Sequence, residues 1–192
     1  RRRRRAGLLR VRDMSEMFDA VETLALMRPQ QGERLTILTN GGGPGVLATD
    51  ALMALGGKLA EIGTPTIEAL DAVLPRTWSR GNPIDIIGDA SGARYTETLA
   101  ALLEDRASDA ILVMNCPTAL AESAECADAV IDVIEQARNS GKLMDRNILT
   151  AWLGEETARE ARRRFAMARI PTYETPEGAI AGFMHAVHYR RN

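Results

Sequence analysis

Apolar positions along the chain follow two spacings, one typical of amphipathic helices and one typical of buried strands. Between residues 14 and 26 the apolar side chains recur at close to 3.6 positions and Pro29 follows, which predicts a helix. From Arg34 onward, short apolar runs rich in β-branched residues alternate with longer helical patterns. The predicted strands are "RLTILTN", "KLAEI", "DAILVMN", "NILTAWL" and "PTYE".

Helices are predicted between and after these strands, with glycine or proline marking several of their ends. They cover "PGVLATDALMALGG", "TPTIEALDAVLP" and residues 92–106, 120–140, 155–168 and 176–190. The segment "WSRGNPIDIIGDASG" fits neither spacing. Ile84, Ile86 and Ile87 are apolar, but the glycines and Pro83 leave too short a run for a central strand. We therefore expect an extended loop at the carboxyl edge of the sheet.

The order of these elements predicts the fold class. Strands that are nearly continuous apolar runs and alternate with helices are typical of a parallel sheet covered on both faces. Because crossovers between parallel strands are right-handed, the expected fold is an α/β, flavodoxin-like three-layer sandwich. Its parallel sheet is predicted to have five strands in the order 2-1-3-4-5.

Composition narrows the class of protein. The hydrophobic share of 45% in 192 residues is enough for a full core, and the net charge of −2 argues against a nucleic-acid-binding surface. No apolar run reaches the roughly 20 residues that span a bilayer, so no membrane partner is expected. Cys116 and Cys126 lie in no CxxC pattern, which favours neither a zinc site nor a disulfide and suits a cytoplasmic protein. The run Arg1–Arg5 is interpreted as an artificial or truncated end, because no other basic cluster accompanies it.

Candidate chemistry follows the first and third predicted strands. Ligands of such sheets bind beyond the carboxyl ends of the strands, near the point where the strand order reverses. Each loop there leads into a predicted helix, whose free N–H groups and dipole favour an anion. The residues concerned are Asn40, Gly41, Gly42 and Gly43 after the first strand, and Asn115, Cys116, Pro117, Thr118 and Ala119 after the third.

The glycines allow two interpretations, a tight strand-to-helix turn or a backbone surface for a ligand, and the sequence leaves both open. Neither the GxxxxGK[ST] phosphate loop nor the GxGxxG dinucleotide motif is present. His185 and His188 are expected to complement a helix dipole rather than bind a metal. Cys116 is expected to be inert, and Asp85, inside an apolar run, to accept hydrogen bonds.

Four segments carry a resemblance to a known family: "LTNGGGPGVLATDAL", "LPRTWSRGNPIDIIGDA", "DAILVMNCPTALA" and "IPTYETPEGAIAGFMHAVHYRR". In this order and spacing they resemble the nucleoside-diphosphate-forming acyl-CoA synthetases, which include ADP-forming acetate–CoA ligases and, as a relative, succinyl-CoA synthetase. The resemblance covers nearly the whole chain from Arg2 onward. It implies a linker and packing helix at residues 1–30 and a flavodoxin-like CoA-ligase domain at residues 31–192.

The resemblance also implies how such an enzyme works. The acid is activated as an acyl phosphate, the phosphate passes to a histidine, and the phosphohistidine phosphorylates ADP. Separate CoA-binding, phosphohistidine and ATP-grasp domains are the implied partners. CoA, ATP or ADP and Mg²⁺ are expected in the full-length protein and none of them on this chain alone. Neither His185 nor His188 matches the family's histidine motif, so no catalytic residue is assigned in this chain.

The implied role of this chain is to help form the acyl-phosphate and phosphohistidine site. Asn40 to Gly43 and Cys116 to Ala119 would border the phosphate, and Asn82 and Asp85 would form a third wall. Two alternatives stay open. The chain resembles equally the synthetase-like body that is fused to bacterial protein lysine acetyltransferases. An FMN-binding flavodoxin-type module is less favoured, because aromatic residues make up only 4% of the chain.

Overall fold

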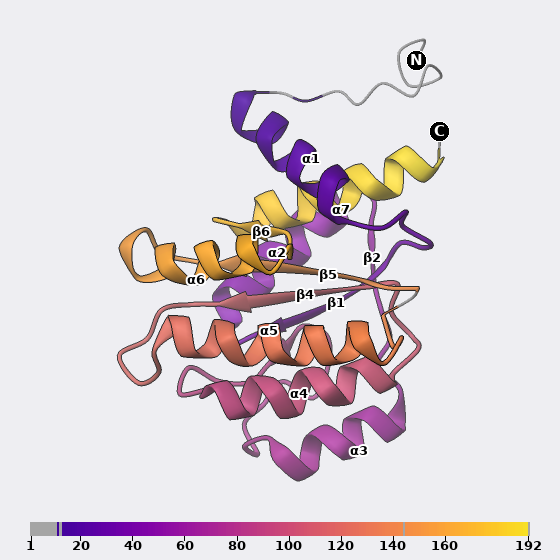
Figure 1. Ribbon diagram of the computed structural model, residues 1–192. Helices are drawn as coiled ribbons and strands as arrows, with labels where there is room; N and C mark the ends of the chain where they lie inside the picture. Colours follow the sequence, from indigo (N-terminus) through magenta and orange to yellow (C-terminus); the bar gives the residue numbers. More distant parts are fainter. Residues whose placement is uncertain (1–10, 12, 144, 192) are drawn as a thin grey trace.

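The computed structural model describes residues 11, 13–143 and 145–191, which form an α/β fold (Figure 1). In the described residues, no helix combines the length and the apolar character needed to cross a membrane. The elements in chain order are α1 (Met14–Leu26), β1 (Arg34–Thr39), α2 (Gly42–Ala54), β2 (Lys58–Leu59), α3 (Thr64–Val73), β3 (Ile84–Asp85), α4 (Gly92–Glu104), β4 (Ala110–Asn115), α5 (Ser123–Asn139), β5 (Asn147–Trp152), α6 (Glu156–Met167), β6 (Thr172–Tyr173) and α7 (Pro176–Arg191).

All strand pairs of the sheet are parallel, and the order along it is β2-β1-β4-β5-β6. Strand β3 lies off this path and pairs with β1. Because β4 occupies one edge of β1, the other edge is shared: β2 pairs with its first residues and β3 with its last. The sheet reverses its order at β1, as expected for a doubly wound fold.

Strand β3 corrects one prediction. The loop expected around Ile84 contains a two-residue strand, with Ile84 opposite Leu38 and Asp85 opposite Thr39. In the described residues the sheet therefore has six strands and not five, and with β3 counted the order differs from the predicted 2-1-3-4-5. The pairing becomes possible because β2 ends at Leu59 and leaves the second half of β1 without a neighbour on that edge. The local sequence around Ile84 does not show that the second half of β1 lacks a neighbouring strand.

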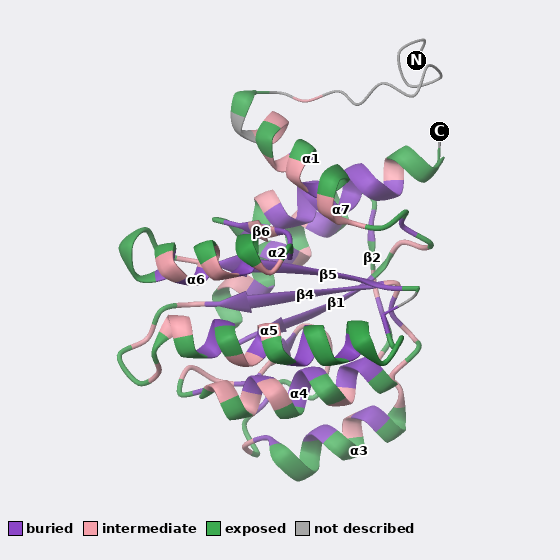
Figure 2. Cartoon of the chain, viewed as in Figure 1, coloured by how far each residue is buried: buried purple, intermediate pink, exposed green. Residues whose placement is uncertain are grey.

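Two apolar cores lie on the two faces of the sheet (Figure 2). Alternation along β4 separates them: Ile111 and Val113 face the core under α3, α4, α5 and α6, while Leu112 and Met114 face the core under α2 and α7. Since both faces are covered, the long central strands are buried along almost their whole length.

Helix α1 lies outside these layers and packs against α7 (Figure 1). The side chain of Asp13 caps it by accepting a hydrogen bond from the N–H of Glu16 at 2.8 Å. The division into residues 1–30 and 31–192 stays a prediction. Within its first part, residues 1–10 and 12, including Arg1–Arg5, lie outside the described residues.

Candidate functional site

The loops after β1 and β4 are joined by one buried side chain, Asn40. Its Oδ1 accepts a hydrogen bond from the N–H of Cys116 at 2.7 Å, and its Nδ2 donates to the carbonyl of Cys116 at 3.0 Å. These two bonds resemble the backbone hydrogen bonds between β1 and β4, and they extend that pairing beyond the ends of the two strands. The two loops that the sequence singled out therefore lie side by side at the carboxyl edge of the sheet.

The glycines after β1 serve different purposes. Gly41 has an extended backbone, with φ −148°, and a Cβ there would lie 2.8 Å from Cys116 Sγ. A Cβ at Gly42 would lie 3.1 Å from Asp85 Oδ2, whereas a Cβ at Gly43 would meet nothing within 4 Å. None of the three has a positive φ. Close approach of Cys116 explains Gly41, and the packing of this chain does not explain Gly43.

Helix α2 begins at this point without a side-chain cap. Its N-cap is Gly41, and its first turn holds no acidic residue. In the described part of the chain, the N–H groups of Gly42 and Gly43 have no hydrogen-bond partner, and both residues are exposed. The start of a helix of 13 residues with open N–H groups is favourable for a negative charge.

The loop after β4 differs from the prediction. Helix α5 begins at Ser123, so Pro117, Thr118 and Ala119 form an irregular loop and not the start of a helix at about residue 120. The N–H of Leu120 donates a hydrogen bond to Thr118 Oγ1 at 3.4 Å, and a local bond of this kind competes with helix formation. The start of α5 is therefore displaced along the chain from the residues that were expected to offer it.

Asn115 points into the core and not toward solvent. Its Nδ2 donates to Tyr95 Oη at 3.1 Å, and Tyr95 Oη donates to the carbonyl of Met114 at 2.9 Å. Ser123 Oγ completes the chain of bonds by donating to Asn115 Oδ1 at 3.4 Å. Burial raises the pKa of Tyr95 well above its ordinary value, so its hydroxyl stays protonated. Sequence reasoning missed Tyr95, because its partners Met114 and Asn115 lie in β4, 19 and 20 positions further along the chain.

A third loop, which leaves β3, closes this edge of the sheet. Asp85 Oδ1 accepts a hydrogen bond from the N–H of Ile87 at 2.9 Å. Ile87 has φ 71°, a left-handed conformation that is strained for a β-branched residue. A Cβ at Gly88 would lie 3.8 Å from both the carbonyl oxygen of Asn40 and the methyl of Thr118. The three loops are thus in contact with one another.

Asn82 was predicted to face the same site, and its hydrogen bonds place it elsewhere. Its Oδ1 accepts from the N–H of Ile37 at 2.9 Å, and its Nδ2 donates to the carbonyls of Leu35 and Ala60, each at 2.9 Å. These partners lie in and beside β1 and β2, where the two strands separate. These three bonds hold the sheet, which leaves Asp85 as the member of this segment that reaches the loops.

The thiol of Cys116 has an environment that opposes ionisation. Burial raises its pKa, and the nearby negative charge of Asp85 raises it further. A thiol with a raised pKa carries little thiolate at neutral pH and is a poor nucleophile. This agrees with the expectation that Cys116 is inert.

Neither histidine lies at the carboxyl edge. His185 Nε2 is 3.2 Å from Glu16 Oε1, so it connects α7 to α1, and His188 lies in the last turn of α7. Among the described residues, no group of three or more histidine, cysteine, aspartate or glutamate side chains is arranged to hold a metal ion.

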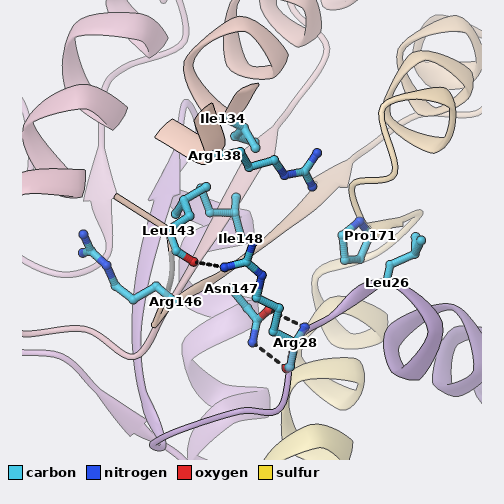
Figure 3. Close-up of a pocket in the computed structure, with 9 residues that line it drawn as sticks. All are labelled: Leu26, Arg28, Ile134, Arg138, Leu143, Arg146, Asn147, Ile148 and Pro171. Carbon is cyan, nitrogen blue, oxygen red and sulfur yellow. Dashed lines mark hydrogen bonds between the residues drawn. The ribbon is translucent and has the colours of Figure 1, made fainter. Parts of the chain in front are cut away.

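A small cavity of about 40 Å³ lies at the opposite edge, where β5 and β6 begin (Figure 3). Arg28 Nη1 donates to the carbonyl of Leu143 at 2.9 Å, and Arg138 donates to the carbonyls of Ala168 and Arg169 just after α6. The lining residues are Leu26, Arg28, Ile134, Arg138, Leu143, Arg146, Asn147, Ile148 and Pro171.

Comparison with known proteins gives consistent relatives. The ADP-forming acetate–CoA ligase I of Archaeoglobus fulgidus is 32% identical over 92% of this chain and 24% of its own length. The alpha subunit of the ADP-forming acetate–CoA ligase II of Pyrococcus furiosus is 32% identical over 98% of this chain and 40% of that subunit. The chain therefore spans well under half the length of these relatives.

Solved structures agree with the sequence matches. An acetyl-coenzyme A synthetase 1 from Candidatus Korarchaeum cryptofilum, solved in complex with phosphate and ADP, matches with a TM-score of 0.90 and 30% identity. The match covers 98% of this chain and 40% of that one. The family model described as the Ligase-CoA domain matches residues 35–190, which is most of the chain. This chain is a member of the Ligase-CoA domain family.

Proposed function

We propose that this chain is the CoA-ligase domain of a larger ADP-forming acetate–CoA ligase. In this proposal, its carboxyl-edge loops help form the site at which the acyl phosphate and the phosphohistidine are handled. The observation that carries the proposal is the open start of α2, where Gly43 has no neighbour within 4 Å of a Cβ position. The relatives named above act as ADP-forming acetate–CoA ligases according to their names.

The role of the backbone at this site is to receive negative charge. Hydrogen bonds to a charged group contribute about 1.5–3 kcal/mol each, and a helix N-terminus adds about 0.3–1 kcal/mol when exposed. Gly42 and Gly43 supply two N–H groups, and Asn40 fixes the adjoining loop. Asp85 Oδ2 lies close to Gly42 and repels an anion, so we expect the isolated chain to bind phosphate weakly.

Other domains complete the reaction in this proposal. A CoA-binding domain holds the thiol substrate, an ATP-grasp domain holds the nucleotide with Mg²⁺, and a third domain carries the histidine that is phosphorylated. Acid, ATP and CoA are converted to acyl-CoA, ADP and phosphate. The loops of this chain position the phosphate and exclude water from one side, and none of its side chains is assigned a bond-making role.

Gly43→Ala in the full-length protein tests the proposal. The substitution meets no atom of this chain, and alanine stabilises a helix relative to glycine by up to about 1 kcal/mol. We therefore expect unchanged or higher thermal stability together with at least roughly tenfold slower acetyl-CoA formation and phosphohistidine formation, equal to a loss of about 1.4 kcal/mol.

Gly63→Ala is the matched control, because a Cβ there meets Asp105 at an ordinary 3.6 Å, in the N-cap of α3. We expect it to leave both rates unchanged. Full activity of the Gly43→Ala protein would refute the role of this loop. A full-length protein that transfers acetyl groups from acetyl-CoA to protein lysines, and makes no acetyl-CoA from acetate, would favour the acetyltransferase alternative.

A further inference from the structure

Ile87 keeps a backbone conformation that is costly for its side chain. Its φ of 71° lies in the left-handed region, where the Cβ of an L-residue crowds the following carbonyl oxygen. Branching at Cβ increases this crowding, whereas glycine adopts the same φ at no steric cost. A glycine at this position would therefore remove strain that the isoleucine imposes.

Hydrogen bonds on both sides of Ile87 hold the strained conformation. The N–H of Ile87 donates to Asp85 Oδ1 at 2.9 Å. The N–H of Ile86 donates to the carbonyl of Thr39 at 2.8 Å, and the carbonyl of Ile86 accepts from Arg94 Nη1 at 3.0 Å. Backbone strain persists where the surrounding contacts over-determine it, and such strain clusters at functional sites.

The two apolar cores do not explain why the strained residue is an isoleucine. Ile87 is partly exposed, and in the described part of the chain it belongs neither to a core nor to the residues packed against one. Its neighbour Ile86, by contrast, is fully buried in the core under α3, α4, α5 and α6. Core packing therefore does not offset the strain at Ile87, which points to a use of this side chain outside the cores.

Ile87 lies between two residues that border the open start of α2. Asp85 Oδ2 is 3.1 Å from the position of a Cβ at Gly42, and a Cβ at Gly88 would lie 3.8 Å from the carbonyl oxygen of Asn40. The side chains of Asn40 and Asp85 offer polar atoms at this edge. Ile87 adds a large apolar side chain beside a helix start that favours a negative charge.

We propose that Ile87 is a specificity-determining residue, which contacts the alkyl group of the carboxylic acid substrate. A short-chain acyl phosphate has one charged end and one apolar end. The open N–H groups of α2 receive the charged end, and Ile87 limits the room for the apolar end, so that acetate is favoured over longer acids. The inference rests on the proposed function, since it places the acid in the same site.

Ile87→Gly in the full-length protein tests the inference. The substitution relieves the strain, so we expect an unfolding temperature no lower than that of the wild type. We expect kcat/KM for acetate to fall, and the preference for acetate over butanoate to fall by roughly tenfold or more, because one methylene group in an apolar pocket changes kcat/KM by about 10–200-fold. Phosphorylation of the histidine by ATP uses no acid and should be unchanged.

Arg169→Gly is the matched control. Arg169 also has a left-handed φ, 54°, and lies at the opposite edge of the sheet, where its carbonyl accepts from Arg138. The control should relieve strain in the same way and leave the acid preference and histidine phosphorylation unchanged. If Ile87→Gly does not fold, Ile87→Asn is the second variant, because asparagine adopts a positive φ readily and its side chain is polar.

An unchanged preference between acetate and butanoate in a folded Ile87 variant would overturn the inference and leave the proposed function standing. So would the same change of preference in Arg169→Gly, which would trace the effect to stability. An equal loss of histidine phosphorylation by ATP would show that Ile87 only shapes the loop, and it would also overturn the inference. A wild-type protein that forms no acyl-CoA from any acid would overturn the proposed function and this inference together.

Discussion

At the scale of single residues, the carboxyl edge depends on how closely two loops approach each other. Asn40 holds the backbone of Cys116 through two hydrogen bonds, and Gly41 leaves room for the sulfur atom of Cys116. Thr39 Oγ1 adds a third restraint by accepting from the N–H of Gly41 at 3.1 Å. The position of the open glycines that follow is set by these few contacts.

Gly41→Ala is expected to destabilise the chain through a clash with one atom. The new Cβ would lie 2.8 Å from Cys116 Sγ but an ordinary 3.6 Å from Cys116 Cβ. Overpacking of this kind costs about 1–3 kcal/mol in the free energy of unfolding. Urea unfolding should show this loss in the wild-type background and little of it in a Cys116→Ala background. Equal losses in both backgrounds would mean that the sulfur is not the obstacle.

At the scale of elements, the short strands β2 and β3 pair with the edge of β1 that β4 leaves free. β2 covers the start of β1 and β3 covers its end, so neither edge strand is long. Asn82 lies between β2 and β3. Its side-chain amide forms hydrogen bonds with the backbone of Ile37, Leu35 and Ala60, in place of the backbone of a neighbouring strand. This side chain therefore acts as part of the sheet.

Asn82→Ala is expected to lower the free energy of unfolding by about 2–4 kcal/mol. Three hydrogen bonds of about 0.5–1.5 kcal/mol each are lost, and the N–H of Ile37 in β1 loses its partner, whereas the carbonyl of Leu35 still accepts from the N–H of Ala60. Asn139→Ala, at the exposed end of α5, serves as the control and should change stability by less than about 0.5 kcal/mol. Denaturant unfolding measures both, and similar values for the two variants would contradict the structural role of Asn82.

At the scale of the whole molecule, one sheet carries two different kinds of surface. The carboxyl edge gathers three loops around an uncapped helix start, and the α7 side carries α1 with its apolar residues outward. Both surfaces are exposed in the described residues. This agrees with relatives that are more than twice as long as the part this chain matches.

The isolated chain is expected to fold and to form no acetyl-CoA from ATP, acetate and CoA. Its two cores are its own, but its sequence has neither a nucleotide-binding loop nor a histidine that matches the motif of the family. Circular dichroism measures folding, and chromatographic detection of acetyl-CoA measures turnover, with the full-length enzyme as the positive control. Turnover by the folded chain alone would contradict its assignment as one domain of a larger ligase.

The amino-acid sequence by itself determined the alternation of strands and helices, the parallel sheet and the two loops that meet at its carboxyl edge. It could do so because these features depend on local periodicity and on the fixed direction of parallel strands. Only the tertiary structure decided that Ile84–Asp85 pairs with β1, that Asn82 belongs to the sheet, that α5 begins at Ser123 and that α1 turns its apolar side outward. Each of these outcomes depends on a partner distant in the chain, such as the free edge of β1 or the hydroxyl of Tyr173, which local periodicity does not record.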